Sequence, residues 1–231
     1  MNEAADDAFL DVFARAPRRA LAPGEVLIHA GDAATQVFNI DTGMLMVSRP
    51  GLDGRRQVLS FLFPDNFVGL TASGRYSFTV EAVTGATVAV APRAALERRL
   101  ARDPAAERAF LAMTYRVLEN LVDLAFSLGQ RSARERLAVF LLYLRHRYLL
   151  SAGLPVDDDA AMRRLEIPMS RQDIADFLGL KKETVSRGLA ELERAGLLRR
   201  DRRHALQLLD IEGLRRLAGV LDFASPARRP G

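Results

Sequence analysis

Three polar residues near the start of a predicted helix have the types and spacing to read the base edges of DNA. Glu183, Ser186 and Arg187 lie at offsets 0, 3 and 4, so they would share one helix face. A guanidinium can donate two hydrogen bonds to guanine, and a carboxylate can accept one from the cytosine amino group. Arg187 and Glu183 could therefore read one G·C pair. The alternative is a surface Glu–Arg pair worth about 0.3–0.5 kcal/mol.

The surrounding residues predict a helix-turn-helix that would hold this face. Ser170 followed by Asp173 is a helix start signal, and Gly179 supplies a sharp turn after the first helix. Ala175, four residues before that glycine, is small enough for a second helix to cross closely over it. The second helix begins near Lys181 and would present its N-terminal residues to the major groove.

Phosphate contacts would position such a motif on the duplex. Hydrogen-bond donors and cations gather at the starts of both helices and in a predicted two-stranded wing, residues 197–209. The expected phosphate contacts are Ser170, Arg171, Gln172, Lys181, Arg199, Arg200, Arg202 and Arg203. For the wing arginines, the alternative is a solvated charge run that contacts no DNA.

A long helix expected from Pro104 onward carries an apolar heptad seam. The seam residues, spaced 4, 3, 4, 3 and 4, are Phe110, Thr114, Val117, Leu121, Leu124 and Leu128. A second stripe, with Met113, Leu118 and Val122, runs beside it. Such a helix must bury two faces, one on its own β block and one on the same helix of a second subunit. The alternative is a helix buried wholly within one larger core.

Short strands separated by Gly and Pro precede that helix and predict an all-β barrel or sandwich. Their expected ranges are 25–31, 36–41, 43–48, 57–63, 78–83 and 87–90. Asp53-Gly54 fits the tip of a hairpin between two of them. After the long helix, a capping box of Ser132 and Glu135 opens a further helix, which runs to about Leu150.

Composition limits the class of protein. The 231 residues are 49% hydrophobic and 27% charged, as in ordinary globular chains. No apolar run approaches the ~18 residues that cross a bilayer, and the acidic start is unlike a secretory signal. We therefore expect a cytoplasmic protein without membrane contact. The net charge of +4 permits nucleic-acid binding. No nucleophile–base pair, phosphate loop or His–Glu motif indicates an enzyme.

Three stretches resemble the CRP/FNR superfamily of bacterial transcription regulators. They are SRQDIADFLG at 170–179, ETVSR at 183–187 and LGQRSARER at 128–136, and the last two are similar to the FNR and FixK branch. The resemblance covers nearly the whole chain and implies an α+β fold. Its parts would be a cyclic-nucleotide-binding-like β-roll (1–102), a dimerisation helix (103–131) and a winged helix-turn-helix domain (132–231).

The resemblance also implies a function. It suggests a homodimeric regulator of low-oxygen, respiratory or nitrogen-oxide genes that binds a palindrome with TTGAT-like half-sites and works with RNA polymerase. Ser186 is similar in role to a residue of the FNR branch that approaches a thymine. Lys182 leaves a TGTGA-like half-site open, because a basic residue there reads an additional guanine in CRP-like members. Gly188 departs from the family, and a helical glycine costs about 1 kcal/mol relative to alanine.

The resemblance places a degenerate effector pocket at Gly69, Leu70, Arg75, Tyr76 and Ser77. Members that respond to cyclic AMP hold its ribose with a Gly-Glu pair and its phosphate with an Arg-Ser element. Here Leu70 replaces the glutamate and Tyr76 the arginine, while Arg75 is one residue out of register and would face the other way. Cyclic AMP binding is therefore not expected, and control without an effector is favoured. An effector-triggered regulator is the alternative.

Cofactor sites are equally sparse. The chain has no cysteine, which excludes an iron–sulfur cluster held by cysteine. The three histidines, His29, His146 and His204, lack metal-ligand spacing with one another. No cofactor is expected, and haem in the β-roll is the alternative.

Overall fold

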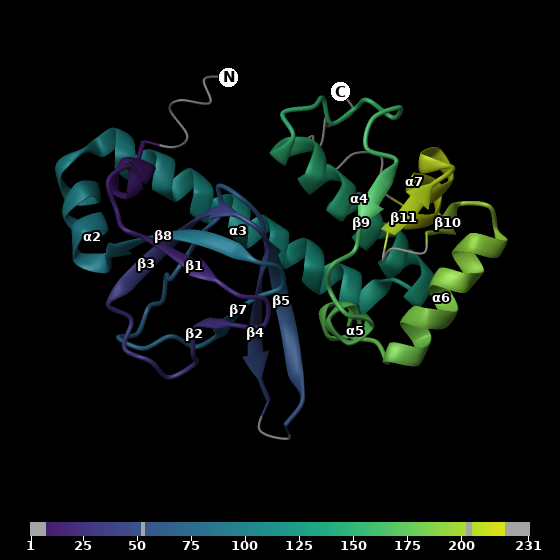
Figure 1. Ribbon diagram of the computed structural model, residues 1–231, viewed down its shortest axis with the longest axis horizontal. Helices are drawn as coiled ribbons and strands as arrows, with labels where there is room; N and C mark the ends of the chain where they lie inside the picture. Colours follow the sequence, from purple (N-terminus) through teal and green to yellow (C-terminus); the bar gives the residue numbers. More distant parts are fainter. Residues whose placement is uncertain (1–7, 52–53, 202–204, 220–231) are drawn as a thin grey trace. The chain divides into compact units, whose positions relative to one another are not determined.

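The computed structural model describes residues 8–51, 54–201 and 205–219, which belong to two compact units divided at residue 125 (Figure 1). The long helix α3 (Pro104–Gln130) crosses this division. The predicted dimerisation helix, 103–131, thus has residues in both units. Among the described residues, no helix is both long and apolar enough to cross a bilayer.

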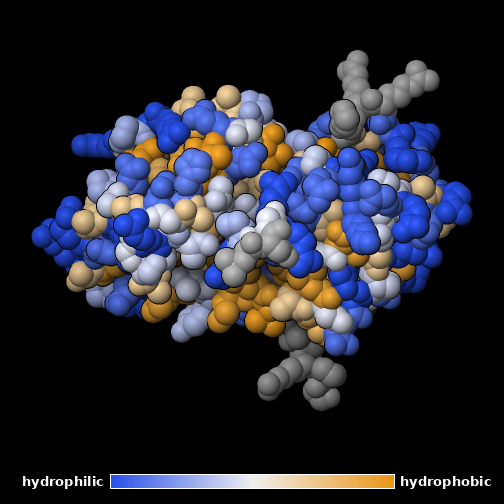
Figure 2. Space-filling view, turned by 90° about the horizontal axis from the view of Figure 1, so that it is seen from below, coloured by the Kyte–Doolittle hydropathy of each residue, from blue (hydrophilic) through white to orange (hydrophobic). Residues whose placement is uncertain are grey.

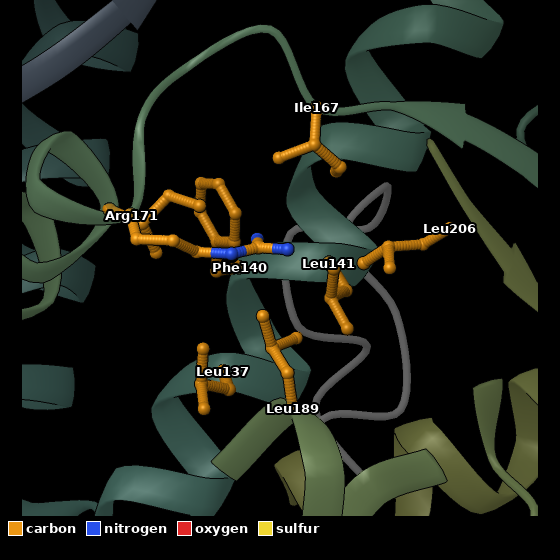
Figure 3. Close-up of a pocket in the computed structure, with 8 residues that line it drawn as sticks. Leu137, Phe140, Leu141, Ile167, Arg171, Leu189 and Leu206 are labelled. Atoms are coloured by element: carbon orange, nitrogen blue, oxygen red, sulfur yellow. The ribbon is translucent and has the colours of Figure 1, made fainter. Parts of the chain in front are cut away.

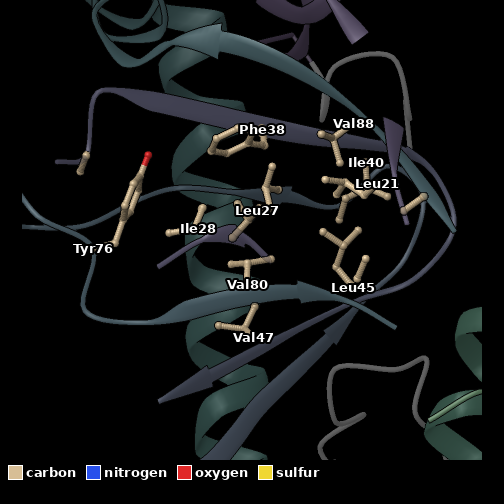
Figure 4. Packing of buried hydrophobic residues seen from close by; sticks show 14 residues of the cluster. Leu21, Leu27, Ile28, Phe38, Ile40, Leu45, Val47, Tyr76, Val80 and Val88 are labelled. Atoms are coloured by element: carbon tan, nitrogen blue, oxygen red, sulfur yellow. The ribbon is translucent and has the colours of Figure 1, made fainter. Parts of the chain in front are cut away.

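Two four-stranded antiparallel sheets form the β-roll of the first unit, in the orders β1-β8-β3-β6 and β2-β7-β4-β5 (Figure 1). Their strands are β1 (Arg18–Leu21), β2 (Val26–Ile28), β3 (Gln36–Thr42), β4 (Leu45–Pro50), β5 (Arg56–Leu62), β6 (Phe67–Val68), β7 (Thr79–Ala82) and β8 (Ala86–Pro92). Strand alternation turns Phe38 and Ile40 of β3 and Val80 of β7 into one apolar core between the sheets (Figure 4).

The first of these sheets is buried on its other face too. The 3-10 helix η1 (Leu10–Phe13), α2 (Arg93–Arg102) and the start of α3 cover it. Phe9 packs edge-on against Phe67 of β6 and Phe110 of α3, with ring centroids 5.8 and 5.5 Å apart. These contacts fix α3 on the β-roll. The sequence patterns did not predict α2, β1 or β6.

The second unit is a winged helix-turn-helix. Its elements are α4 (Ala133–Ser151), β9 (Arg164–Glu166), α5 (Arg171–Leu178), α6 (Lys182–Arg194), β10 (Leu198–Arg200), β11 (Ala205–Leu208) and α7 (Ile211–Ala218). The strands form an antiparallel sheet in the order β10-β11-β9, so the predicted two-stranded wing has a third strand. Leu137 and Leu141 of α4 meet Leu189 of α6 and Leu206 of β11 in its core (Figure 3).

Both predicted capping boxes are present. Ser132 and Glu135 exchange hydrogen bonds at the start of α4, and Ser170 and Asp173 do the same at the start of α5. Gly179 ends α5 in the left-handed conformation, with φ of 61°, as the predicted sharp turn requires. The start and end of α5 are therefore determined by local hydrogen bonds and by this turn.

Close packing of α6 on α4 accounts for Gly188, for which the sequence offered no reason. The residue is buried, and a Cβ placed on it would overlap Cδ1 of Leu137. The absence of a side chain thus lets α6 approach α4 closely. This packing offsets the lower helix propensity of glycine at this position.

We predict that Gly188→Ala destabilises the protein although alanine is the better helix former. The new methyl group meets Leu137, and overpacking of this kind costs about 1–3 kcal/mol in free energy of unfolding. Gly129→Ala is the matched control, because nothing lies within 4 Å of a Cβ at that helical glycine. Urea unfolding should therefore show a loss for Gly188→Ala and a small gain for Gly129→Ala. A gain for both would refute the packing explanation.

Candidate nucleic-acid interface

The predicted base-reading residues share the exposed face of α6. Val185, Leu189 and Leu192 are at most 2% exposed and hold the opposite face against the core. Lys182, Glu183, Ser186 and Arg187 are all exposed. The 3.6-residue period thus separates packing residues from polar ones along a single helix. Glu183 lies in the first turn, where the helix begins.

The side chains of Glu183 and Arg187 are available for contacts outside the chain. Within the part of the chain that the structure describes, neither forms an ion pair or a side-chain hydrogen bond. The alternative of an intrahelical Glu–Arg pair is therefore not what the structure contains. An unpaired carboxylate and guanidinium, one helical turn apart, can accept and donate hydrogen bonds to a base pair in the major groove.

The candidates for phosphate contact at the starts of α5 and α6 differ in exposure and in the hydrogen bonds that they form within the chain. The hydroxyl of Ser170 accepts a hydrogen bond from the Asp173 amide at 3.1 Å, and the Gln172 side chain donates to Asp176 at 2.6 Å. The Arg171 side chain is half-buried and extends toward Phe140 (Figure 3). Burial lowers the pKa of the Arg171 guanidinium, and the nearby Arg200 lowers it further. Lys181 is exposed at the N-cap of α6.

The wing arginines that the structure describes are engaged within the chain. The Arg200 guanidinium pairs with Glu193 of α6 at 2.6 Å, and its backbone amide also donates to that carboxylate. These contacts hold the pKa of Glu193 below its usual value. Arg199 donates to the Gln207 side chain on β11. Arg202 and Arg203 lie outside the described residues.

The apolar faces of α3 differ from the predicted seam. Phe110 packs on the β-roll, and Leu128 contacts the backbone around Gly179 of its own unit. Thr114 donates its hydroxyl to the Phe110 carbonyl, and Leu124 is half-buried. Only the middle of the seam, Val117 and Leu121, joins the large exposed apolar residues. Phe110 and Leu128, at the two ends of the predicted seam, thus also take part in contacts within the chain.

A neighbouring stripe of α3 is exposed instead. Leu111, Tyr115, Leu118 and Val122 are 45%, 62%, 56% and 58% exposed. Their spacing of 4, 3 and 4 places them on one helix face. The sequence analysis assigned Leu118 and Val122 to a second stripe but did not identify Leu111 or Tyr115. The space-filling view of Figure 2 shows hydrophobic areas among hydrophilic ones. Four large exposed apolar side chains on one face of a single helix form the kind of patch that marks an interaction site.

The region matching an effector pocket is filled by the chain itself. Tyr76 is 5% exposed and belongs to the core between the sheets, where it lies near Phe38 and Ile28 (Figure 4). Its hydroxyl donates to the Gln36 carbonyl at 2.6 Å, and burial raises the pKa of the phenol. Arg75 instead lies at the surface and donates to the Gly31 carbonyl at 2.7 Å.

The other pocket residues are either closely packed within the chain or exposed at its surface. Gly69 has a φ of 119°, and a Cβ there would lie 3.0 Å from the Gln36 carbonyl oxygen, so the chain is closely packed at this point. Leu70 and Ser77 are exposed. The one-residue shift predicted to turn Arg75 away from the interior is what the structure contains.

The histidines are not arranged as a metal site where they are described. His29 is exposed, and His146 is half-buried on α4, where burial and the neighbouring Arg147 and Arg145 lower its pKa. His204 lies outside the described residues. In residues 8–51, 54–201 and 205–219, no three His, Asp or Glu side chains gather in a group that could hold a metal ion.

Comparison with known proteins agrees with this arrangement. Residues 18–103 match the family described as a cyclic nucleotide-binding domain, and residues 135–217 match the Crp-like helix-turn-helix domain. The chain belongs to the CRP/FNR superfamily. The chain is therefore a DNA-binding transcription regulator and not an enzyme.

Within the superfamily the chain is FixK-like. It is 37% identical to the nitrogen fixation regulation protein FixK of Bradyrhizobium diazoefficiens, over 76% of this chain and 71% of that protein. It is 33% identical to FixK of Rhizobium meliloti, over 84% of each chain. The solved structure of FixK2 from Bradyrhizobium japonicum superimposes with a TM-score of 0.78 and 30% identity, covering 92% of this chain and 99% of that one.

We predict that Arg187→Ala weakens binding to the preferred DNA sequence by about 5- to 150-fold, which corresponds to about 1–3 kcal/mol for a bidentate base contact. The variant should lose its preference for one G·C pair. Its affinity for duplexes that already carry another base pair at that position should change little. Arg194→Ala, which removes an exposed charge from the last turn of the same helix, is the control. Dissociation constants for single-substitution duplexes measure the effect. Equal weakening across all duplexes would assign Arg187 to a phosphate.

Proposed function

We propose that this protein is a homodimeric transcription regulator that binds a palindromic operator without a small-molecule effector. The observation that carries the proposal is the exposed, unpaired face of α6, Glu183, Ser186 and Arg187, backed by a fully packed opposite face. One such helix covers only half of a two-fold symmetric site. Two copies must therefore present their α6 helices together, about 34 Å apart, to enter successive major grooves.

The exposed stripe of α3 supports a second copy of this chain as the dimer partner. Leu111, Tyr115, Leu118 and Val122 form a continuous apolar row that water would otherwise hydrate. A two-fold axis along such a helix brings each row against its own copy, which makes the interface self-complementary. Val117 and Leu121, from the predicted seam, flank the row and would widen the contact.

The half-site is proposed to be TTGAT-like. Glu183 and Arg187 suit one G·C pair, and the small Ser186 allows a thymine methyl group to approach. Membership of the FixK-like branch favours the same sequence. Lys182 is exposed one residue before this group and keeps a TGTGA-like half-site as the competing outcome.

Control without an effector follows from the interior of the β-roll. Tyr76 occupies the place of the phosphate-binding arginine and is hydrogen-bonded to the chain's own backbone. A ligand would have to displace a buried aromatic side chain and break this hydrogen bond, and Arg75 faces away from the interior. Neither haem nor an iron–sulfur cluster is part of the proposal, and regulation would act through the amount of protein present.

The wider role is proposed from the relatives. Their names describe nitrogen fixation regulation and transcriptional activation. Low-oxygen, respiratory or nitrogen-oxide genes are therefore the proposed targets. RNA polymerase is the proposed protein partner, and the cytoplasm is where both DNA and polymerase would be met.

Selection of bound sequences from a random DNA pool tests the whole proposal. The purified protein without additives should enrich a palindrome whose half-sites lie about 10 base pairs apart, centre to centre. Binding should weaken steeply with salt because phosphate contacts release counterions. Enrichment of a single half-site, or enrichment only after a ligand is added, would contradict the dimeric or the effector-free part respectively.

We predict that Leu118→Asp abolishes dimers, because each interface would bury two unpaired carboxylates. Asn120→Asp introduces the same charge two residues along the exposed part of the same helix and is the matched control. Sedimentation velocity at micromolar concentration should give monomers for Leu118→Asp and dimers for the control. Operator binding should fall together with dimerisation. Dimers of Leu118→Asp would rule out this stripe as the interface.

We also predict that millimolar cyclic AMP leaves the thermal midpoint unchanged. A ligand at 100 times its Kd would stabilise the folded state by about 2.7 kcal/mol, which moves the midpoint of a domain this size by several degrees. Cyclic GMP should behave alike. A reproducible rise in the thermal midpoint, seen in both the native protein and Tyr76→Phe, would contradict the prediction. It would show that the β-roll binds a nucleotide in spite of Tyr76.

A further inference from the structure

Arg136 lies in the first turn of α4 and links the ends of two other helices, α3 and α5. Its guanidinium donates three hydrogen bonds to backbone carbonyls: Nη2 to Leu128 at 2.6 Å, Nε to Arg131 at 2.9 Å, and Nη1 to Leu178 at 2.9 Å. The Leu128 carbonyl lies in the last turn of α3, the Arg131 carbonyl belongs to the residue that follows this helix, and the Leu178 carbonyl is in the last residue of α5. One planar cation thus spans from the long helix to the helix-turn-helix.

The carbonyls at these two helix ends lack hydrogen-bond partners within their helices and carry the negative end of each helix dipole. A guanidinium is suited to satisfy both because its donors point in fixed directions from one plane. A lysine ammonium could neutralise the charge but could not hold two helix ends at a defined angle with the same rigid fork. The geometry is therefore more specific than ordinary helix capping.

A second contact lies at the same place. A Cβ built on Gly179, the turn residue between α5 and α6, would lie 3.2 Å from Cδ2 of Leu128 and 3.6 Å from Nη1 of Arg136. The end of α3 therefore packs directly on the turn that precedes the reading helix. The left-handed φ of 61° at Gly179 allows this turn to be tight.

We infer that Arg136 is a positioning residue for DNA recognition, because it fixes the angle between the end of α3 and the reading helix α6. The inference rests on the proposed function, in which α3 carries the dimer contact. Any change of angle at this joint would alter the separation of the two α6 helices in the dimer. Arg136 would thus set which spacing between half-sites the protein accepts, without touching DNA.

The natural absence of cysteine allows this angle to be measured directly. Cysteines are introduced at Gln130→Cys, at the end of α3, and Arg194→Cys, in the last turn of α6, where both residues are exposed. Spin labels on them report a distance by pulsed electron resonance. A large excess of unlabelled chain limits the signal to pairs within one molecule, so the readout needs neither a dimer nor DNA.

Arg136→Met should broaden or shift this distance distribution relative to the otherwise native chain, while Arg134→Met should leave it unchanged. Arg134 lies on the same helix and forms only a loose 3.7 Å pair with Glu191. Arg136→Lys should also broaden the distribution, and it takes the place of the methionine variant if that variant does not fold. An unaltered distribution in the folded Arg136 variants would overturn the inference.

Operator binding supplies the second arm. With two base pairs inserted between the half-sites, the native protein should lose about 10-fold or more in affinity because the recognition helices leave register. In the Arg136 variants this penalty should shrink to about 3-fold or less, since a looser joint tolerates both spacings. The same penalty in both proteins would count against Arg136. Native protein without any preference for a palindrome would refute the proposed function, and the distance measurement would still decide the role of Arg136.

Discussion

The packing of α6 against α4 is the contact on which the proposed DNA-reading surface depends. Val185, Leu189 and Leu192 lie in the core of the second unit, and Gly188 removes the side chain that would hold the two helices apart. Because three residues of one face are fully committed to this core, the opposite face is left with the polar residues and no alternative orientation. Rigid support of this kind is what base recognition requires, since hydrogen bonds to base edges depend on direction as much as on charge.

The helix α3 also has one packed face and one exposed face. Phe110 satisfies one apolar face within the β-roll through its contact with Phe9, whereas Tyr115 and Leu118 leave a second face in water. Exposed apolar area of this kind is stabilised by association. The β-roll behaves in the opposite way, because Tyr76 completes its core from within the chain and bonds to the Gln36 carbonyl. The exposed face of α3 thus supports the proposed dimer, and the filled interior of the β-roll supports the proposed control without an effector.

Much of the fold could be predicted from local patterns. Both capping boxes, the turn at Gly179 and the long helix from Pro104 were read correctly because each depends on residues a few positions apart. The helix α2 was missed, since only two of its ten residues, Leu96 and Leu100, are large and apolar, and it begins without a side-chain cap. The pairing of Arg200 with Glu193 also escaped prediction, because it joins a strand and a helix that only the folded unit brings together.

The resemblance to the CRP/FNR superfamily implied the loss of a phosphate-binding arginine at Tyr76. The sequence by itself determined the helix-turn-helix and the shared face of Glu183, Ser186 and Arg187. These features follow from helical and strand periodicity, which is set by the backbone and can be read along the chain. Only the tertiary structure decided which stripe of α3 stays exposed, why residue 188 has no side chain, and which arginine joins α3 to α5. Those outcomes depend on which surfaces meet across long stretches of sequence, and periodicity carries no information about the neighbour that a face will find.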